Sequence, residues 1–254
     1  MSLKRKEPMD EAATSNSAPP KRQRDMKEYF LKFLHHQPLL ITSHRILKSR
    51  NITFIIGPEK EQFTAHESSI AGLSETLRVL VTGSMKEAIE AKVIWEDVEP
   101  AVFVSLMEFA YTGSFSMANL NVDMIPYNVK AYMMTAKLYV LADKYDIAAL
   151  KRLCLFMFIY SLAYISGNDM TMDILVATMR YVYENTIQKD QLRKLLLRFL
   201  ITDMQWVLSD KGMRKMLSDI PELASQMILL VPSYYWDELH WGRPSTSTQA
   251  TMTS

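Results

Sequence analysis

Strand-forming sequence is confined to three short runs in the first half of the chain, and this confinement limits the possible folds more than any other feature. Residues 52–56 (ITFII) are β-branched or aromatic and end at Gly57-Pro58, which is typical of a strand. Residues 62–65 are long enough to return as its hairpin partner, and residues 92–95 form another short strand. The sequence therefore predicts only a small sheet.

Apolar spacing predicts helices around this sheet. Leu77, Leu80 and Val81 share one helical face, and Gly83 follows where a helix ends. A further helix begins at Glu99-Pro100, with proline in its first turn, and ends at Gly113.

After a connection at 114–128, two more helices are expected, with Asp146 as the N-cap between them. Beyond Asp169 the pattern is helical only, over 169–185, 189–201, 203–217 and 221–230. Short strands early and helices throughout indicate an α/β (α+β) domain followed by an all-helical extension.

The spacing of the seven glycines excludes several catalytic and nucleotide-binding motifs, because no two lie closer than eleven residues apart. A dinucleotide fingerprint, a P-loop and a nucleophile elbow all need glycines only a few residues from one another. Cys154 is the only cysteine, so the chain can form neither an intramolecular disulfide nor a zinc site built on paired thiolates.

The overall charge gives no reason to expect nucleic acid or a membrane as a direct partner. The net charge is +1, from 29 basic and 28 acidic side chains, so no bulk field attracts an anionic surface. The longest uncharged stretch, between Arg152 and Asp169, is too short for a membrane span and includes polar residues. The N-terminus has no apolar signal-peptide core.

The N-terminal tail is basic and almost free of large apolar side chains, so we expect it to be disordered. Two basic clusters separated by 14 residues are typical of a bipartite nuclear import signal, which favours the nucleus as the location. The alternative is a cytoplasmic protein whose tail only improves solubility. The clusters are Lys4, Arg5 and Lys6, and Lys21, Arg22 and Arg24.

Six motifs follow one another at suitable spacing over about residues 49–158. They are a hairpin leading into Phe63-Thr64-Ala65-His66, then Ser74-Glu75-Thr76-Leu77, Gly83-Ser84-Met85-Lys86-Glu87-Ala88, Val93-Ile94-Trp95-Glu96-Asp97-Val98-Glu99-Pro100, Phe109-Ala110-Tyr111-Thr112-Gly113 and Leu138-Tyr139-Val140-Leu141-Ala142-Asp143-Lys144-Tyr145-Asp146. This series resembles the BTB/POZ domain, in the divergent form found in fungal proteins with a helical C-terminal extension. The resemblance implies a small sheet flanked by helices.

The predicted organisation has five parts. They are a disordered basic tail at 1–28, a helical segment at 29–48, the BTB/POZ domain at 49–160, a helical C-terminal region at 161–241 and a disordered tail at 242–254.

The resemblance implies a non-enzymatic protein–protein interaction protein that forms a homodimer and recruits protein partners. Two alternatives remain open: a substrate adaptor of a cullin-based ubiquitin ligase, with a cullin as partner, and a nuclear transcription cofactor. No catalytic, cofactor-binding or metal-binding residues are predicted, and no cofactor. His66 occupies the family's histidine position, where a structural hydrogen-bonding or packing role is expected, and Cys154 is expected to be a buried, inert thiol.

Two candidate interaction sites follow from these hypotheses. Met85 and Glu87 resemble the hydrophobic-x-Glu element of cullin-binding members, in which an apolar anchor lies beside a carboxylate. An apolar helical stripe that would otherwise be exposed is a candidate dimer interface; it consists of Tyr29, Phe30, Phe33 and Leu34.

This sequence lacks the two charged residues that line the corepressor pocket in transcription-repressor members of the BTB/POZ family. Those members carry Asp and Lys where this chain has Asn51 and Glu67. This departure argues against a corepressor pocket at that place.

Overall fold

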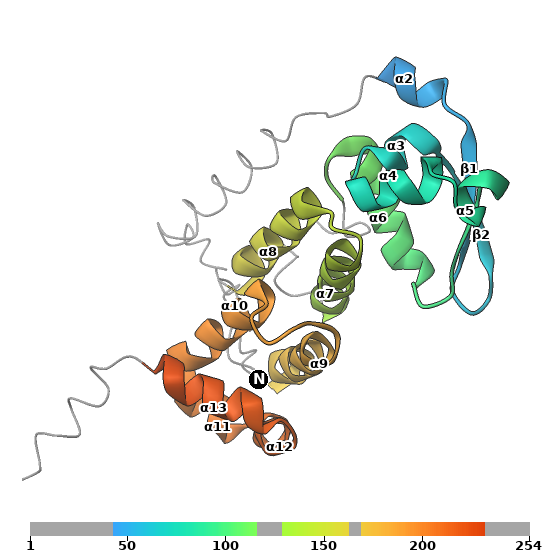
Figure 1. Cartoon of the computed structure of the whole chain (residues 1–254). Coiled ribbons are helices and arrows are strands. Elements are labelled where there is room, and N and C mark those ends of the chain that lie inside the picture. The colour runs from blue at the N-terminus through green and yellow to red at the C-terminus, as the bar shows by residue number, and fades with distance from the viewer. Residues whose placement is uncertain (1–42, 116–128, 163–168, 232–254) are drawn as a thin grey trace, which may run out of the picture.

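The computed structural model describes residues 43–115, 129–162 and 169–231, and Figure 1 shows their arrangement. In chain order the elements are α2 (Ser43–Leu47), β1 (Asn51–Ile56), β2 (Glu61–His66), α3 (Glu67–Ala71), α4 (Glu75–Thr82), α5 (Lys86–Glu90), β3 (Lys92–Trp95), α6 (Pro100–Thr112), α7 (Val129–Lys144), α8 (Ala148–Leu162), α9 (Asp169–Asn185), α10 (Gln191–Leu200), the 3-10 helix η2 (Ile201–Asp203), α11 (Met204–Ser209), α12 (Lys211–Asp219) and α13 (Pro221–Leu230).

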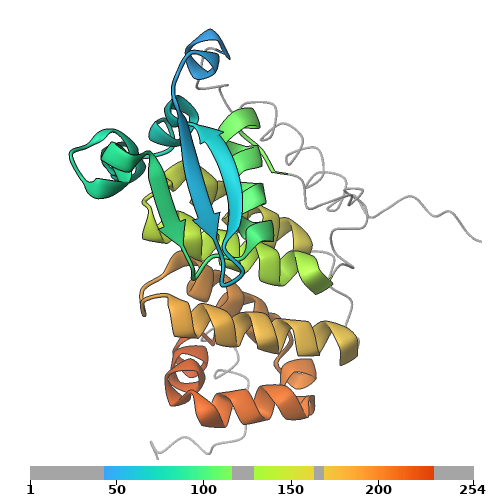
Figure 2. The same ribbon diagram turned by 90° about the vertical axis from the view of Figure 1, so that its right-hand side faces the viewer.

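The sheet has the strand order β2-β1-β3, with β1 antiparallel to β2 and parallel to β3. Ile52, Phe54 and Ile56 alternate along β1 and are fully buried, because every second side chain of a strand points to the same face. Figure 2 shows the helices behind this sheet, with its other face toward the viewer. The three predicted strands are confirmed to within one residue at each end.

Helix α6 packs against the buried face of the sheet. The ring of Phe103 lies 5.0 Å from that of Phe54 and 5.1 Å from that of Phe63. The helix begins at Pro100, as predicted, because proline lacks an N–H that the first turn would leave unpaired. It ends at Gly113, whose φ of 74° is the left-handed conformation that suits glycine.

The turn between α7 and α8 differs from the prediction. Asp146 is not the N-cap of α8, because Ile147 directly precedes Ala148, the first residue of the helix. Asp146 instead takes a left-handed conformation with φ 53°, and its N–H bonds to the carbonyl of Asp143 at 3.2 Å. Aspartate tolerates this conformation better than most residues, so it completes the turn rather than capping the helix.

The C-terminal region is helical, and two of the four predicted helices have the predicted bounds, namely α9 and α13. The single helix predicted over 203–217 is wrong. The chain breaks at Asp210, which has ψ 134° and accepts a hydrogen bond from the Met213 N–H at 2.7 Å. Aspartate is a strong N-cap, so it ends α11 and begins α12.

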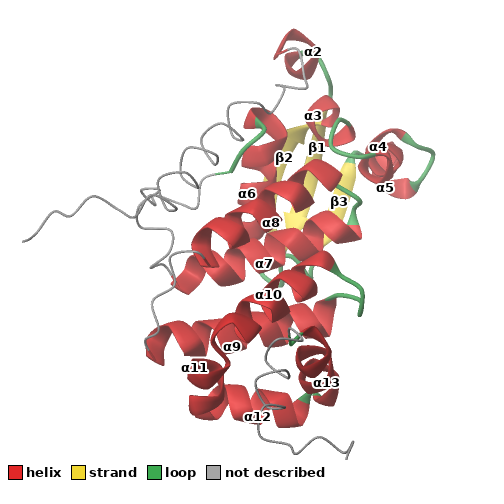
Figure 3. Ribbon diagram, turned by 90° about the vertical axis from the view of Figure 1, so that its left-hand side faces the viewer, coloured by secondary structure: helices red, strands yellow, loops and turns green. Residues whose placement is uncertain are grey.

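One hydrophobic core joins the BTB-like half to the helical region. It includes Ile52 in the sheet, Leu138 in α7, Leu196 in α10 and Met227 in α13. Figure 3 shows the corresponding layers, with the sheet at one end, α7 and α8 in the middle and α9 to α13 at the other end. Among the described helices, none combines the length and the apolar character needed to cross a membrane.

Candidate functional site

A tight turn after α4 presents Met85 to solvent. The turn requires glycine at Gly83, since a Cβ there would lie 2.4 Å from the Val79 carbonyl oxygen. Met85 then precedes α5 in the N-cap position, with its side chain 57% exposed. The predicted element Met85-Lys86-Glu87 therefore lies at the start of a short helix rather than in an open loop.

Ile89 continues this exposed feature along α5, and Glu87, which is partly buried, lies between Met85 and Ile89 in the sequence. Ile89 lies one turn beyond Met85 and is 73% exposed. Lys86 pairs with Glu90 at 3.9 Å, whereas Glu87 forms no ion pair with any residue that the structure describes. We call Met85, Glu87 and Ile89 the α5 surface. Ile89 was not predicted from the sequence, although its spacing of four residues from Met85 indicates a shared helix face.

His66 has the predicted hydrogen-bonding role. Its backbone N–H donates to the Tyr111 hydroxyl at 2.9 Å, and its Nδ1 lies 3.0 Å from the same oxygen. These contacts join the end of β2 to α6. Nearby, Glu67 pairs with Arg50, which also donates to the Val81 carbonyl at 2.7 Å. The carboxylate of Glu67 therefore contributes to packing contacts between α3, α4 and the start of the sheet.

Cys154 is fully buried in α8, as predicted, and burial raises the pKa of its thiol well above the ordinary value. Over the parts of the chain that the structure describes, no three His, Cys, Asp or Glu side chains are grouped so as to hold a metal ion. The candidate dimer stripe at Tyr29–Leu34 and both basic clusters lie outside the described residues.

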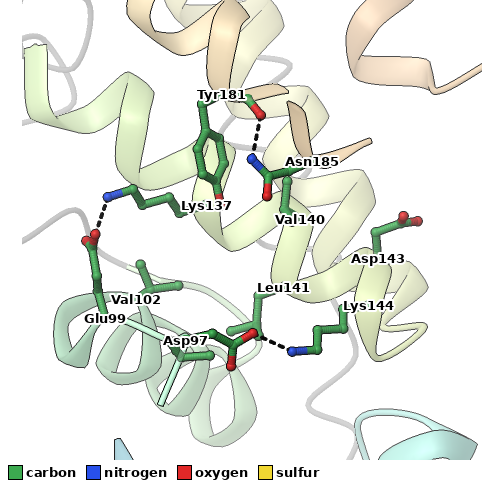
Figure 4. A pocket seen from close by; sticks show the side chains of 11 residues that line it. Asp97, Glu99, Val102, Lys137, Val140, Leu141, Asp143, Lys144, Tyr181 and Asn185 are labelled. Carbon is green, nitrogen blue, oxygen red and sulfur yellow. Dashed lines mark hydrogen bonds and ion pairs between the residues drawn. The ribbon is translucent and has the colours of Figure 1, made fainter. Parts of the chain in front are cut away.

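A pocket that the sequence analysis missed lies between the β3–α6 turn, α7 and α9 (Figure 4). Its volume is about 460 Å³. Val98, Val102 and Leu141 are buried and give it an apolar wall. The remaining lining residues are Asp97, Glu99, Lys137, Val140, Asp143, Lys144, Tyr181 and Asn185.

Two ion pairs cross from the β3–α6 turn to α7 beside this pocket. Lys144 donates to Asp97 at 2.6 Å, and Lys137 pairs with Glu99 (Figure 4). The two lysines are seven residues apart and so share one face of α7. The hydrogen bond from Lys144 lowers the pKa of Asp97 below its ordinary value.

Helix α9 supplies the polar groups on the opposite side of the pocket. The Asn185 amide nitrogen donates to the Tyr181 carbonyl at 2.8 Å. Burial raises the pKa of Tyr181, and the nearby charges of Glu99 and Asp97 raise it further. The phenol is therefore protonated at neutral pH.

Comparison with known proteins identifies the family of the N-terminal part of the described chain. The model of the BTB/POZ domain family matches residues 44–162. "BTB/POZ and MATH domain-containing protein 6" of Arabidopsis thaliana is 24% identical over 213 residues, which are 82% of this chain and 48% of that protein. "TD and POZ domain-containing protein 1-like" of Mus musculus is 30% identical over 93 residues, 37% of this chain and 22% of that protein.

This chain thus spans about half, or less, of the length of the curated relatives it matches. The matched region begins in α2 and ends with α8, so it includes the sheet, α6 and the helix that carries the α5 surface. Residues 44–162 are therefore a BTB/POZ domain, a protein-interaction module, and a helical C-terminal region follows it.

Proposed function

We propose that the protein recruits a protein partner through the α5 surface and has no chemistry of its own. The observation that carries this proposal is the exposure of Met85 and Ile89, with Glu87 between them in the sequence, a carboxylate without an ion-pair partner in the described chain. When a partner buries apolar side chains that are already held in a fixed place, their burial stabilises the complex. A carboxylate beside them can accept hydrogen bonds that orient the partner.

A cullin is the partner that the sequence of this surface favours, so the second candidate function is a substrate adaptor of a cullin-based ubiquitin ligase. Met85-Lys86-Glu87 resembles the hydrophobic-x-Glu element of cullin-binding BTB domains; its Met85 is exposed and its Glu87 is partly buried. The nuclear cofactor hypothesis and the fungal subtype remain predictions from the sequence. A corepressor pocket at Glu67 is disfavoured, because Arg50 already pairs with that carboxylate.

The test is a pull-down from cell extract with the full chain as bait. We expect the wild-type protein to recover a cullin, and the double variant Met85→Ala with Glu87→Ala to lose it. Ile187→Ala is the control, since Ile187 is also an exposed apolar residue, at 74%, and lies outside α5. Equal recovery of partners by the double variant and the wild type would refute the role of the α5 surface.

We also propose that the protein forms a homodimer through Tyr29, Phe30, Phe33 and Leu34, since BTB domains often dimerise. A dimer of this 29.3 kDa chain would have twice that mass in light scattering. Deletion of residues 26–40 should halve the measured mass. A full-length protein that is already monomeric at micromolar concentration would end this proposal.

A further inference from the structure

We propose that the pocket between the β3–α6 turn, α7 and α9 binds a Lys or Arg side chain within an extended segment of a partner protein. This pocket is separate from the α5 surface, and its test does not depend on the function proposed above.

The walls of the pocket match the stem of such a side chain. Lys and Arg carry an apolar methylene stem and a charged end group, and they bury the stem while keeping the end group among polar atoms. Val98, Val102 and Leu141 provide the apolar wall, and the half-buried ring of Tyr181 faces them (Figure 4). The volume of about 460 Å³ also leaves room for flanking backbone of the partner.

The hydrogen-bond acceptors of the lining favour a cation that carries several donors. Three carboxylates line the pocket, those of Asp97, Glu99 and Asp143, against the two ammonium groups of Lys137 and Lys144. Asp143 pairs with Lys151, which lies outside the lining. Each carboxylate thus has one ammonium partner, and a carboxylate can accept several hydrogen bonds. Burial raises the pKa of Tyr181, and the charges of Glu99 and Asp97 raise it further, so this hydroxyl stays neutral beside them.

Two further acceptors are available inside the pocket. The Tyr181 hydroxyl makes no hydrogen bond to any residue that the structure describes, and in Figure 4 it points from α9 toward the space between the two ion pairs. The Asn185 nitrogen is engaged by the Tyr181 carbonyl, so its Oδ1, which points into the pocket in Figure 4, is left to accept a partner's backbone N–H.

Other occupants fit these groups less well. An anion would meet three carboxylates in the lining, and both lining lysines are already paired. A purely apolar side chain would cover the Tyr181 hydroxyl and the Asn185 oxygen without supplying donors, and buried polar groups without partners are costly. A basic side chain can pack its stem against the apolar wall and donate hydrogen bonds from its charged end to the acceptors.

The experiment uses the full chain and the peptide acetyl-Ala-Leu-Arg-Leu-Ala-amide as the probe. The control peptide replaces arginine with citrulline, which keeps the shape and removes the positive charge. In an NMR titration with isotope-labelled protein, we expect the arginine peptide to shift the amide signals of Tyr181 and Asn185. We expect the citrulline peptide to bind about tenfold more weakly.

Two variants connect this binding to the pocket. Tyr181→Phe removes only the hydroxyl, and Glu99→Gln removes one charge of the lining; each should weaken the arginine peptide several-fold. Asp173→Asn changes an exposed carboxylate of α9 outside the lining and should have no effect. Thermal melting followed by circular dichroism verifies that each variant is folded. The comparison of the arginine and citrulline peptides uses the wild-type protein alone, so it does not depend on the folding of any variant.

Three results would overturn the proposal. They are equal binding of the arginine and citrulline peptides, unchanged binding by both pocket variants, and equally tight binding of free spermidine, which would assign the pocket to small cations.

Discussion

Cys154 shows how a residue's surroundings decide its chemistry. The thiol is fully buried in α8, and burial raises its pKa because a thiolate would lose its hydration there. Only the thiolate is an effective nucleophile, so both access and ionisation disfavour reaction. The same reasoning separates Cys154 from a catalytic cysteine, which needs an exposed and electropositive environment.

We therefore predict that Cys154 does not react with Ellman's reagent at pH 8 while the protein is folded. In guanidinium chloride one thiol per chain should react, because the sequence contains one cysteine. The measurement is the absorbance of the released thiolate against time. Rapid labelling of the native protein would show that α8 opens far more readily than its burial indicates.

Single elements were predicted well where a local signal marks both ends. Helix α6 has proline in its first turn and a left-handed glycine after its last residue, and both are readable from the sequence. Helices α3 and α5 have five residues each, which is too short for apolar periodicity to detect. The division of 203–217 was missed because the amphipathic pattern continues past Asp210, whose capping role depends on the backbone.

The end of α6 gives a prediction with a matched control. Gly113 has φ 74°, where an added Cβ is strained, so Gly113→Ala should destabilise the protein by about 1 kcal/mol or more. Gly72 ends α3 with φ −75°, so Gly72→Ala should be neutral or slightly stabilising. Urea denaturation measures both. Equal midpoints for the two variants would contradict the role assigned to the left-handed conformation.

At the scale of the whole molecule, the sequence reveals less about surfaces than about elements. The α5 surface could be predicted because its residues are adjacent in the chain and resemble a family motif. The pocket could not, because Glu99, Lys137 and Tyr181 come from three elements separated by about forty residues each. Their side chains meet only because α7 packs between the β3–α6 turn and α9.

The same packing predicts that the BTB/POZ domain and the helical region unfold together. One core includes both, and the Tyr139 hydroxyl of α7 donates at 2.8 Å to Asp190, the residue that caps α10. Trp95 reports on the sheet and Trp206 on the helical region. Variants in which one of these two is the only tryptophan left, with Trp236 and Trp241 replaced as well, should give coincident transitions in denaturant.

Tyr139→Phe should lower the stability of both regions at once. It removes the hydroxyl that donates to the buried carboxylate of Asp190, and loss of a buried hydrogen-bond partner costs about 1–3 kcal/mol. Both tryptophan signals should therefore shift to lower denaturant concentration by the same amount. Tyr111→Phe also removes a hydrogen-bonding hydroxyl, but at an exposed position, and is expected to shift them less. If the Trp206 transition moves while that of Trp95 stays in place, the helical region is a separate folding unit and the contact between α7 and α10 does not couple it to the BTB/POZ domain.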